Sequence, residues 1–263
     1  MKKDKEKLIL ITNDDGIFAP GLKHLVNLLK PYGKVLVVAP DKPQSGMGHA
    51  ITVNNVLRLK KYEFDKDIEA YSCSGTPVDC VKLAIYRLLK RKPDLLVSGI
   101  NHGANYSVNV LYSGTMSAAV EGALEGVPSI GFSLCDHALD ADFSVCTPVV
   151  TKLVENVLTG EMPHDVCLNV NIPKMKPGLL QGIKVCRQAK AHWEDDFDAR
   201  KDPFGNEYYW LVGEFKNLDK GEDTDVYALE HGFASVVPVQ FDMTAHHAFT
   251  ELNNWSYDFS KVK

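Results

Sequence analysis

The sequence LILITNDDG occupies residues 8–16 and joins a continuous Leu/Ile run to two carboxylates and a glycine. An unbroken apolar run is typical of a strand that is buried on both faces of a parallel sheet. A helix-period segment opens at Pro20, and its apolar residues share one face until Pro31 ends the pattern. The run KVLVVA at 34–39 then predicts a second buried strand.

This alternation of strand and helix continues through most of the chain. Further strands are predicted at Val53–Leu59, Ile68–Cys73, Leu95–Ser98, Val127–Leu134 and Phe233–Val239, and helices at Pro77–Leu88, Ser117–Gly126, Pro148–Leu158 and Asp242–Leu252. Such an alternation predicts an α/β fold, in which a mostly parallel sheet carries helices on both faces.

Residues 176–230 depart from that pattern. They are rich in charged and aromatic residues, as in AHWEDDF at 191–197, and their helical period is weak. We expect an extended hairpin arm in this region. With no repeat or linker elsewhere, the sequence predicts a single domain over 1–263, with an α/β core at 8–175 and a C-terminal strand and helix at 231–263.

Composition narrows the class of protein. Of the 263 residues, 45% are apolar and 24% are charged, which excludes disordered and fibrous classes. A net charge of −5 argues against a nucleic-acid polymer as partner, because phosphate backbones favour basic faces. No apolar run approaches the roughly 20 residues of a membrane span. The apolar stretch Leu8–Thr12 is shorter than the core of a signal peptide, so we expect no export signal. The six cysteines form no CxxC pair, so we expect reduced, buried thiols and a cytoplasmic location.

Oxygen-bearing side chains follow three of the predicted strands. Asp14 and Asp15 come after the first strand, Ser45 lies in the loop after the second, and Asn101 follows Leu95–Ser98. The carboxyl ends of parallel strands share one edge of the sheet, where ligands bind near a switch in strand order. Such an all-oxygen set suits Mg²⁺ or Mn²⁺ better than zinc. The alternative is that Asp-Asp-Gly only forms a turn and caps the next helix.

Two Ser-Gly-Thr strings each precede a predicted helix: Ser74, Gly75 and Thr76, and then Ser113, Gly114 and Thr115. A helix start offers unpaired N–H groups and the positive end of the dipole, which together attract anions. Ser and Thr also favour simple N-caps, so each string alone has two interpretations. Two copies beside an acid cluster favour a phosphate ester bound next to a cation.

Several of these strings together resemble the SurE family of metal-dependent 5′/3′-nucleotidases. They are TNDDG, APDKPQSGMGHAIT, SGTPVD, SGINHGANYSVNVLYSGTMSAAVEGALEGVPSIGFS and TDVYALEHGFASVVPVQFDMTAH, which cover most of residues 8–134 and 223–247. The resemblance implies a Rossmann-like three-layer α/β/α sandwich with a C-terminal arm that is exchanged between the subunits of a homodimer or homotetramer. It also implies removal of phosphate from nucleoside 5′-monophosphates, and in some members from 3′-nucleotides or short polyphosphate.

The resemblance carries residue roles onto this sequence. One divalent metal ion per subunit would be held by Asp14, Asp15, Ser45 and Asn101, with the two aspartates also catalytic. Phosphate would contact Asn105, Ser113, Gly114 and Thr115, while Ser74, Gly75 and Thr76 would line the pocket more than touch phosphate. Residues 190–222 match the family pattern least.

The implied reaction is hydrolysis of a phosphomonoester by a cation-activated water. Asp15 is the first candidate to accept the proton of that water or to align it. No residue is singled out as the general acid for the leaving group. His102 is a candidate, although a solvent-facing loop histidine is the favoured interpretation.

Two rival functions have weaker support. A phosphatase of the haloacid-dehalogenase type needs Asp-x-Asp after the first strand, and Asn13 stands where its nucleophile would be. A non-catalytic mononucleotide-binding module would keep the phosphate loops but has little need of paired acids and a cation.

Two further features each have a functional and a structural interpretation. Asp242 and His246 are four residues apart, and we favour a structural salt bridge on a helix over an acid–base pair. Trp193, Phe197, Tyr208, Tyr209 and Trp210 make the arm rich in aromatic residues. They could stack on a nucleobase, but we favour burial in a subunit interface.

Overall fold

The computed structural model describes residues 6–138, 140–160, 162–255 and 257. The two ends of the expected domain, 1–5 and 258–263, lie outside this part of the chain. The strands are β1 (Leu8–Thr12), β2 (Lys34–Pro40), β3 (Leu59–Asp65), β4 (Ile68–Cys73), β5 (Leu95–His102), β6 (Ser129–Cys135), β7 (Val166–Pro173), β8 (Gly182–Val185), β9 (Ala191–Lys201), β10 (Glu207–Asn217) and β11 (Phe233–Gln240). The α-helices are α1 (Pro20–Leu29), α2 (Pro77–Leu83), α3 (Gly114–Leu124), α4 (Thr147–Thr159), α5 (Asp225–Glu230) and α6 (Phe249–Asn253).

Shorter helical turns join these elements. They are η1 (Lys30–Tyr32), η3 (Ser107–Leu111), η4 (Phe143–Cys146) and η5 (His246–Ala248), together with the π-helical turn η2 (Ala84–Leu88) that continues α2. None of the helices in the described ranges is both long and apolar enough to cross a membrane.

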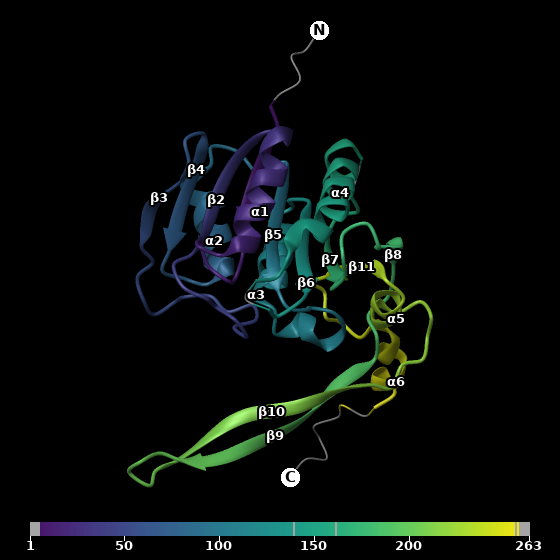
Figure 1. Cartoon of the computed structure of the whole chain (residues 1–263). Helices are drawn as coiled ribbons and strands as arrows, with labels where there is room; N and C mark the ends of the chain where they lie inside the picture. The colour runs from purple at the N-terminus through teal and green to yellow at the C-terminus, as the bar shows by residue number, and fades with distance from the viewer. Residues whose placement is uncertain (1–5, 139, 161, 256, 258–263) are drawn as a thin grey trace.

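Within the described residues, nine strands form one sheet in the order β3-β4-β2-β1-β5-β6-β7-β11-β8. Most neighbouring pairs are parallel; β3 runs antiparallel to β4, and β11 to β7. Helices cover both faces (Figure 1), which confirms the predicted α/β/α sandwich. Strand order reverses at β1, because β2 and β4 lie on one side of it and β5, β6 and β7 on the other. Parallel sheets bind ligands at such a switch point.

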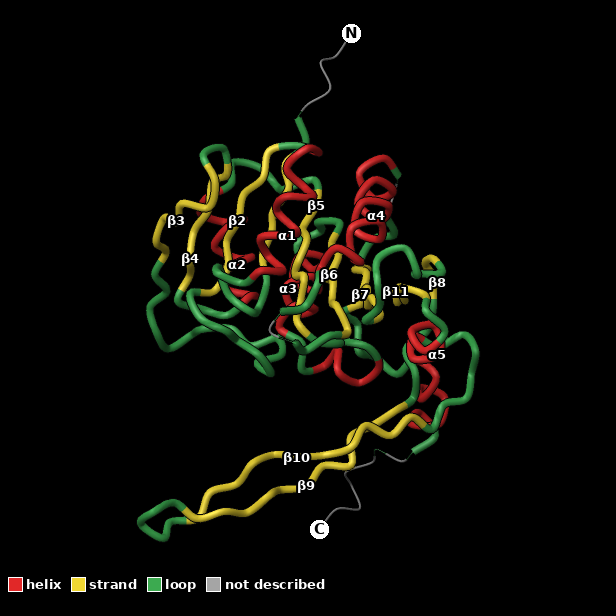
Figure 2. The backbone as a smooth tube through the Cα atoms, in the orientation of Figure 1, coloured by secondary structure: helices red, strands yellow, loops and turns green. Residues whose placement is uncertain are grey.

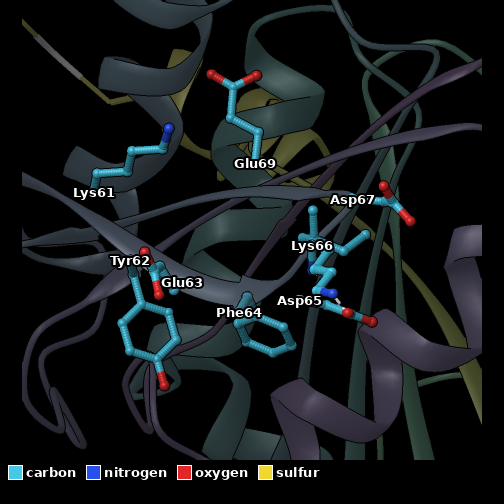
Figure 3. Close-up of a pocket in the computed structure, with 9 residues that line it drawn as sticks. Lys61, Tyr62, Glu63, Phe64, Asp65, Lys66, Asp67 and Glu69 are labelled. Atoms are coloured by element: carbon cyan, nitrogen blue, oxygen red, sulfur yellow. Dashed lines mark hydrogen bonds between the residues drawn. The ribbon is translucent and has the colours of Figure 1, made fainter.

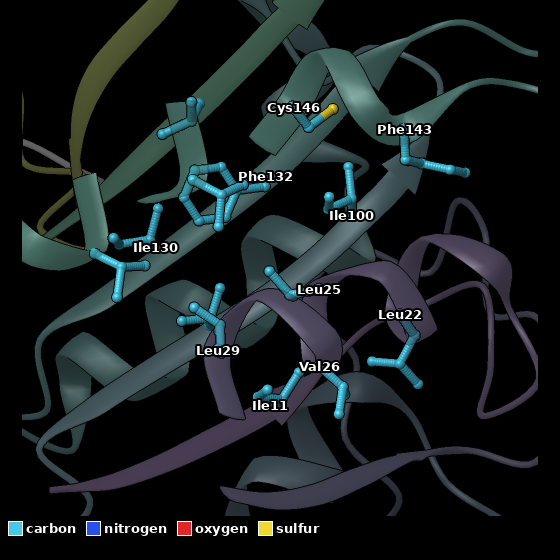
Figure 4. Packing of buried hydrophobic residues seen from close by; sticks show 14 of the residues in the cluster. Ile11, Leu22, Leu25, Val26, Leu29, Ile100, Ile130, Phe132, Phe143 and Cys146 are labelled. Atoms are coloured by element: carbon cyan, nitrogen blue, oxygen red, sulfur yellow. The ribbon is translucent and has the colours of Figure 1, made fainter. Parts of the chain in front are cut away.

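Alternate residues of each central strand point to opposite faces of the sheet, and each face packs against its own layer of helices. In β1, Ile9 and Ile11 face α1 and α4 in one core, whereas Leu10 faces α2 and α3 in the other. Figure 4 shows the first core, where Leu22 and Leu25 of α1 pack with Phe132 of β6. All of these side chains are fully buried, which accounts for the unbroken apolar runs in the sequence.

The arm is the antiparallel pair β9–β10, which projects away from the body of the molecule (Figure 2). Its root packs on η3, where the Trp193 indole N–H donates to Asn109 Oδ1 at 2.7 Å. Phe215 of β10 also lies edge-on to Tyr106, with ring centroids 5.5 Å apart. The predicted hairpin is therefore confirmed, and its root contacts the segment that joins Asn101 to Ser113.

Two element predictions are wrong. Residues 53–58 are a loop rather than a strand, because the segment before them is hydrogen-bonded to α2 and α3 instead of to the sheet; the edge strand β3 begins at Leu59. The expected helix at Asp242–Leu252 is helical only from His246. Asp242 accepts from the backbone N–H of Thr244 at 2.9 Å, a local turn that competes with the helix. The salt bridge from Asp242 to His246 nevertheless forms, at 3.2 Å.

The six cysteines are all free thiols, as predicted, and Cys135 is the one that is only partly buried. Burial raises the pKa of Cys167 to about 12 and raises that of Cys146 as well.

Candidate active site

The turn after β1 presents both aspartates at the switch point of the sheet. The Asn13 side chain closes this turn: its Nδ2 donates to the Gly16 carbonyl at 2.9 Å, and its Oδ1 accepts from the Gly16 N–H at 3.2 Å. The Asp14 carbonyl accepts from the N–H of Gln44 at 2.8 Å, which ties the loop after β2 to the same turn. Asn13 is thus a turn residue, and a haloacid-dehalogenase nucleophile is absent at this position.

Asp14 is 4% exposed and lies against the start of α3. The Thr115 hydroxyl donates to Asp14 Oδ1. A Cβ at Gly114 would lie 2.7 Å from the Cβ of Asp14, so the close approach requires glycine there. Burial raises the pKa of Asp14 to about 6, and the neighbouring charge of Asp15 adds to the rise.

Asp15 faces β5 and is more accessible than Asp14. Its Oδ2 accepts from the backbone N–H of His102 at 3.1 Å. Burial raises the pKa of Asp15 as well, against the lowering effect of that hydrogen bond. The bond fixes one carboxylate oxygen between neighbouring strands and leaves Oδ1 without a donor among the described residues.

Asn101 and Ser45 occupy the loops on either side of the β1 turn. Asn101 is 8% exposed, and its Nδ2 donates to the Gly103 carbonyl at 2.8 Å, which leaves Oδ1 as a free acceptor. Ser45 is exposed and follows Gln44, whose N–H binds the Asp14 carbonyl. The structure therefore gathers Asp14, Asp15 and Asn101 at one edge and ties the Ser45 loop to them by its backbone.

A hard divalent cation fits this set of side chains. Two adjacent, poorly solvated carboxylates disfavour their own charge, and a cation offsets that cost. No group of three or more His, Cys, Asp or Glu side chains able to hold a metal occurs in the part of the chain that the structure describes. The donor set is thus two carboxylates completed by neutral oxygens, which favours Mg²⁺ or Mn²⁺ over zinc.

The start of α3 supplies the anion-binding part of the site. Ser113 is its N-cap, and the Ser113 hydroxyl accepts from the Met116 N–H at 3.0 Å. The first N–H groups of a helix have no partner within it. The N–H of Thr115 faces the Asp14 carboxylate and lowers its pKa, whereas that of Gly114 makes no hydrogen bond among the described residues and remains for a ligand. The hydroxyl of Thr115, predicted to contact phosphate, instead binds Asp14.

Asn105 lies in a buried network of polar side chains. Its backbone N–H donates to Asn171 Oδ1 at 2.7 Å, and its carbonyl accepts from Asn169 Nδ2 at 2.8 Å. Asn105 Nδ2 donates to the Ser133 hydroxyl at 2.8 Å, so one N–H and Oδ1 of its amide remain available. The two β7 asparagines were missed from the sequence; polar residues alternating through the apolar string LNVNI were the signal.

The first Ser-Gly-Thr string has another role. Thr76 caps α2 by accepting from the Asp79 N–H at 3.2 Å, and it donates to the Ala50 carbonyl at 2.7 Å. The Ser74 hydroxyl accepts from the Arg58 N–H at 3.0 Å. Gly75 has the Asp79 side chain 2.6 Å from where its Cβ would lie. The N-cap interpretation thus holds for Thr76, whose hydroxyl proton is already donated to Ala50, while Ser74 holds the chain at Arg58.

His102 differs from the favoured expectation of a solvent-facing residue. Its ring lies edge-on to Phe143, with centroids 5.0 Å apart, and its Nε2 is buried without a hydrogen-bond partner among the described residues. The solvent-facing interpretation is wrong because the ring turns inward against η4.

A hollow elsewhere on the molecule does not contain the site. Figure 3 shows it at the β3–β4 edge hairpin, lined by residues 61–69. Its lining includes none of the predicted site residues, and its charged side chains come from one hairpin rather than converging from several strand ends.

The fold and the site define an α/β protein with paired carboxylates beside the start of a helix at the switch point of its sheet. Residues 9–195 match the model of the family described as survival protein SurE. A protein named 5′-nucleotidase SurE from Flavobacterium psychrophilum is 61% identical over 249 residues, covering 94% of this chain and 97% of the relative. The protein of the same name from Flavobacterium johnsoniae is 60% identical over 254 residues, covering 96% of this chain and 98% of the relative.

A solved structure agrees with these relatives. The crystal structure of the SurE protein from Aquifex aeolicus superposes with a TM-score of 0.81 at 38% identity and covers 94% of this chain and 98% of its own. The chain belongs to the SurE family.

Proposed function

We propose that this protein is a metal-dependent 5′-nucleotidase that hydrolyses the phosphomonoester of nucleoside 5′-monophosphates. The observation that carries the proposal is the meeting of Asp14, Asp15 and Asn101 with the N-terminus of α3 at the switch point. The relatives named 5′-nucleotidase support the substrate class.

The cation, Mg²⁺ or Mn²⁺ and one per subunit, would be held by Asp14, Asp15, Ser45 and Asn101. When bound, it supplies Lewis-acid charge and a water of lowered pKa. Thr115 and Gly114 hold the Asp14 carboxylate in place, and the His102 N–H holds that of Asp15. The Oδ1 of Asp15, which accepts no hydrogen bond among the described residues, would accept a proton from the attacking water.

The phosphate would be held by the chain's own N–H donors. The N–H of Gly114 and the remaining amide N–H of Asn105 support an anion at the start of α3. These donors act on the charge that builds on the phosphoryl oxygens as the ester bond breaks. Ser74, Gly75 and Thr76 contribute by holding the loop that carries Ser45.

We further propose a cytoplasmic homodimer or homotetramer in which the arm is exchanged between subunits. The arm's aromatic residues Trp193, Phe197, Tyr208, Tyr209 and Trp210 are between 40% and 61% exposed in the single chain. An exposed apolar set of this size on a projecting hairpin favours burial against another subunit. Light scattering tests this assembly by measuring its molar mass in solution. The measurement compares the native protein with a variant in which residues 202–206, the turn between β9 and β10, are replaced.

The function is tested by release of inorganic phosphate from AMP, GMP, 3′-AMP and short polyphosphate with Mg²⁺ or Mn²⁺. We expect turnover of 5′-monophosphates that EDTA abolishes and excess Mn²⁺ restores. Asp15→Asn should lower it by several orders of magnitude. Binding of AMP without release would instead support the mononucleotide-binding module, and a trapped phospho-aspartate would support the haloacid-dehalogenase type.

A further inference from the structure

The network around Asn105 connects the candidate phosphate site to a strand that carries none of the residues assigned to it. Asn169 and Asn171 lie on β7, two strands away from β5 across β6. They are 2% and 0% exposed, and the amide of Asn171 donates to Asn169 Oδ1 at 3.0 Å. Two linked carboxamides in a core are costly unless they are fully paired, so their partners matter.

The partners are the main-chain groups of Asn105. Asn171 accepts from the Asn105 N–H and Asn169 donates to the Asn105 carbonyl, so both polar groups of this residue's backbone are held from β7. Ser133, 0% exposed on β6, holds one N–H of the Asn105 amide. Asn105 sits in the loop between β5 and η3, which is also tied to β6 by the Gly103 N–H donating to the Leu134 carbonyl at 2.9 Å.

We infer that Asn169 and Asn171 are positioning residues, which aim the Asn105 amide at the substrate phosphate. The inference rests on the proposed function. Neither residue reaches the cation-holding side chains through any hydrogen bond in the described part of the chain, so their effect should fall on phosphate and not on the metal. Because the backbone of Asn105 is held at both its N–H and its carbonyl, the remaining N–H of its side-chain amide has a fixed orientation. A fixed donor is what oriented binding of an anion requires.

The test measures binding of inorganic phosphate to the Mg²⁺-loaded protein by titration calorimetry, together with KM for AMP. Asn171→Leu removes the acceptor for the Asn105 N–H at similar volume. We expect Asn171→Leu to weaken phosphate binding and raise KM roughly tenfold, as for loss of a partner to a buried donor. Mg²⁺ affinity without phosphate should be unchanged.

Ser235→Ala is the matched control. Ser235 lies on β11, where it pairs in register with Asn171 of β7, and it is fully buried. Its hydroxyl has no hydrogen-bond partner among the described residues. Its removal disturbs the same part of the core without touching Asn105. If Asn171→Leu fails to fold, as judged by circular dichroism, Asn169→Ala takes its place with the same expected loss.

A double-mutant cycle separates positioning from a merely structural role. In the Asn105→Ala background, Asn171→Leu should add less than about twofold to the loss of phosphate affinity. The inference is overturned if Asn171→Leu matches Ser235→Ala, or if its effect persists in full without the Asn105 amide. A native protein that binds phosphate but releases none from nucleotides would overturn the proposed function and leave this inference standing.

Discussion

Asp14 combines a functional demand with a cost in stability. Its carboxylate is buried, and burial raises its pKa to about 6 from the usual value near 4. Without a cation, the free energy of unfolding contributed by this group therefore falls as pH rises from about 4 through about 6, because the folded chain holds the proton more tightly. The proposed cation would bind the charged form and so offset this cost.

Asp14→Asn should accordingly abolish turnover without weakening the fold. The amide carries no charge and still accepts from Thr115, so at pH 7.5 in EDTA the variant should be as stable as the native protein, or more stable by up to about 3 kcal/mol. Thermal unfolding in EDTA and phosphate release with Mn²⁺ measure the two effects. A variant that unfolds at lower temperature would assign Asp14 a structural role instead.

Gly114→Ala should disturb the site at the start of α3, where the helix packs against Asp14. The added methyl would lie 2.7 Å from the Asp14 Cβ, so either the carboxylate or the start of α3 must move. We expect turnover to fall about 10- to 100-fold, as small misplacements of reacting groups do. Gly178→Ala is the control: nothing lies within 4 Å of the added methyl, and the φ of +84° at Gly178, which Gly114 does not share, should cost stability but leave turnover near the native value. Equal turnover in the two variants would contradict the close packing of α3 on Asp14.

At the scale of elements, the loop between β2 and β3 is held by the start of α2 and by Glu121 near the end of α3. The backbone and hydroxyl of Thr52 donate to the Asp79 carboxylate at 3.1 and 2.6 Å, and Thr76 binds Ala50. His49 binds Glu121 of α3 at 2.9 Å. Ser45 belongs to this loop, so α2 fixes the position of a candidate metal ligand without contacting the metal.

The variant Thr76→Val therefore distinguishes a role of Thr76 in capping α2 from a role in contacting the phosphate. It removes the cap of α2 and the bond to Ala50, and should lower the free energy of unfolding by roughly 1–2 kcal/mol. Affinity for inorganic phosphate should stay within about twofold. A loss of phosphate affinity of tenfold or more, with stability unchanged, would show that Thr76 contacts the ligand. Urea unfolding and calorimetry give the two values.

Elements with a strong pattern were predictable from the sequence. The unbroken apolar runs of β1, β2 and β5 predicted buried parallel strands. Because the carboxyl ends of parallel strands share one edge of the sheet, the acids and amides that follow them were predicted to lie together at the switch point. Residues 53–58 were not predictable, because their valines are exposed and of these six residues Leu57 packs against the core beside α2, so their apolar content does not reflect sheet pairing. The roles of Thr115 and Thr76 were also beyond the sequence: a hydroxyl at a helix start serves a cap, a carboxylate or a ligand equally well, and only the tertiary contacts decide.

At the scale of the whole molecule, the buried thiols make stability depend on pH above the neutral range. Burial raises the pKa of Cys146 and Cys167 in the folded chain, and an unfolded thiol titrates near 8.5. As pH rises above that value the unfolded chain loses protons that the folded chain keeps, so the free energy of unfolding falls. For Cys167 this loss continues to about pH 12.

Urea unfolding between pH 8 and 10 should show a decline that approaches about 1.4 kcal/mol per pH unit for each buried thiol. Cys167→Ala should make the decline shallower by one such contribution. Iodoacetamide at pH 8 should label these thiols only after unfolding. Stability that is constant over this range, or labelling of the folded protein at the rate of the unfolded chain, would contradict their burial.

The most direct test of the central claim is to measure the binding of Mn²⁺ by titration calorimetry. The claim is that the ends of β1 and β5 and the Ser45 loop together hold one hard cation beside the start of α3. The native protein should bind one Mn²⁺ per chain, and Asp15→Asn should bind it at least 100-fold more weakly while keeping its fold. Equal Mn²⁺ affinity in Asp15→Asn, or phosphate release by a native protein that binds no Mn²⁺, would contradict the account.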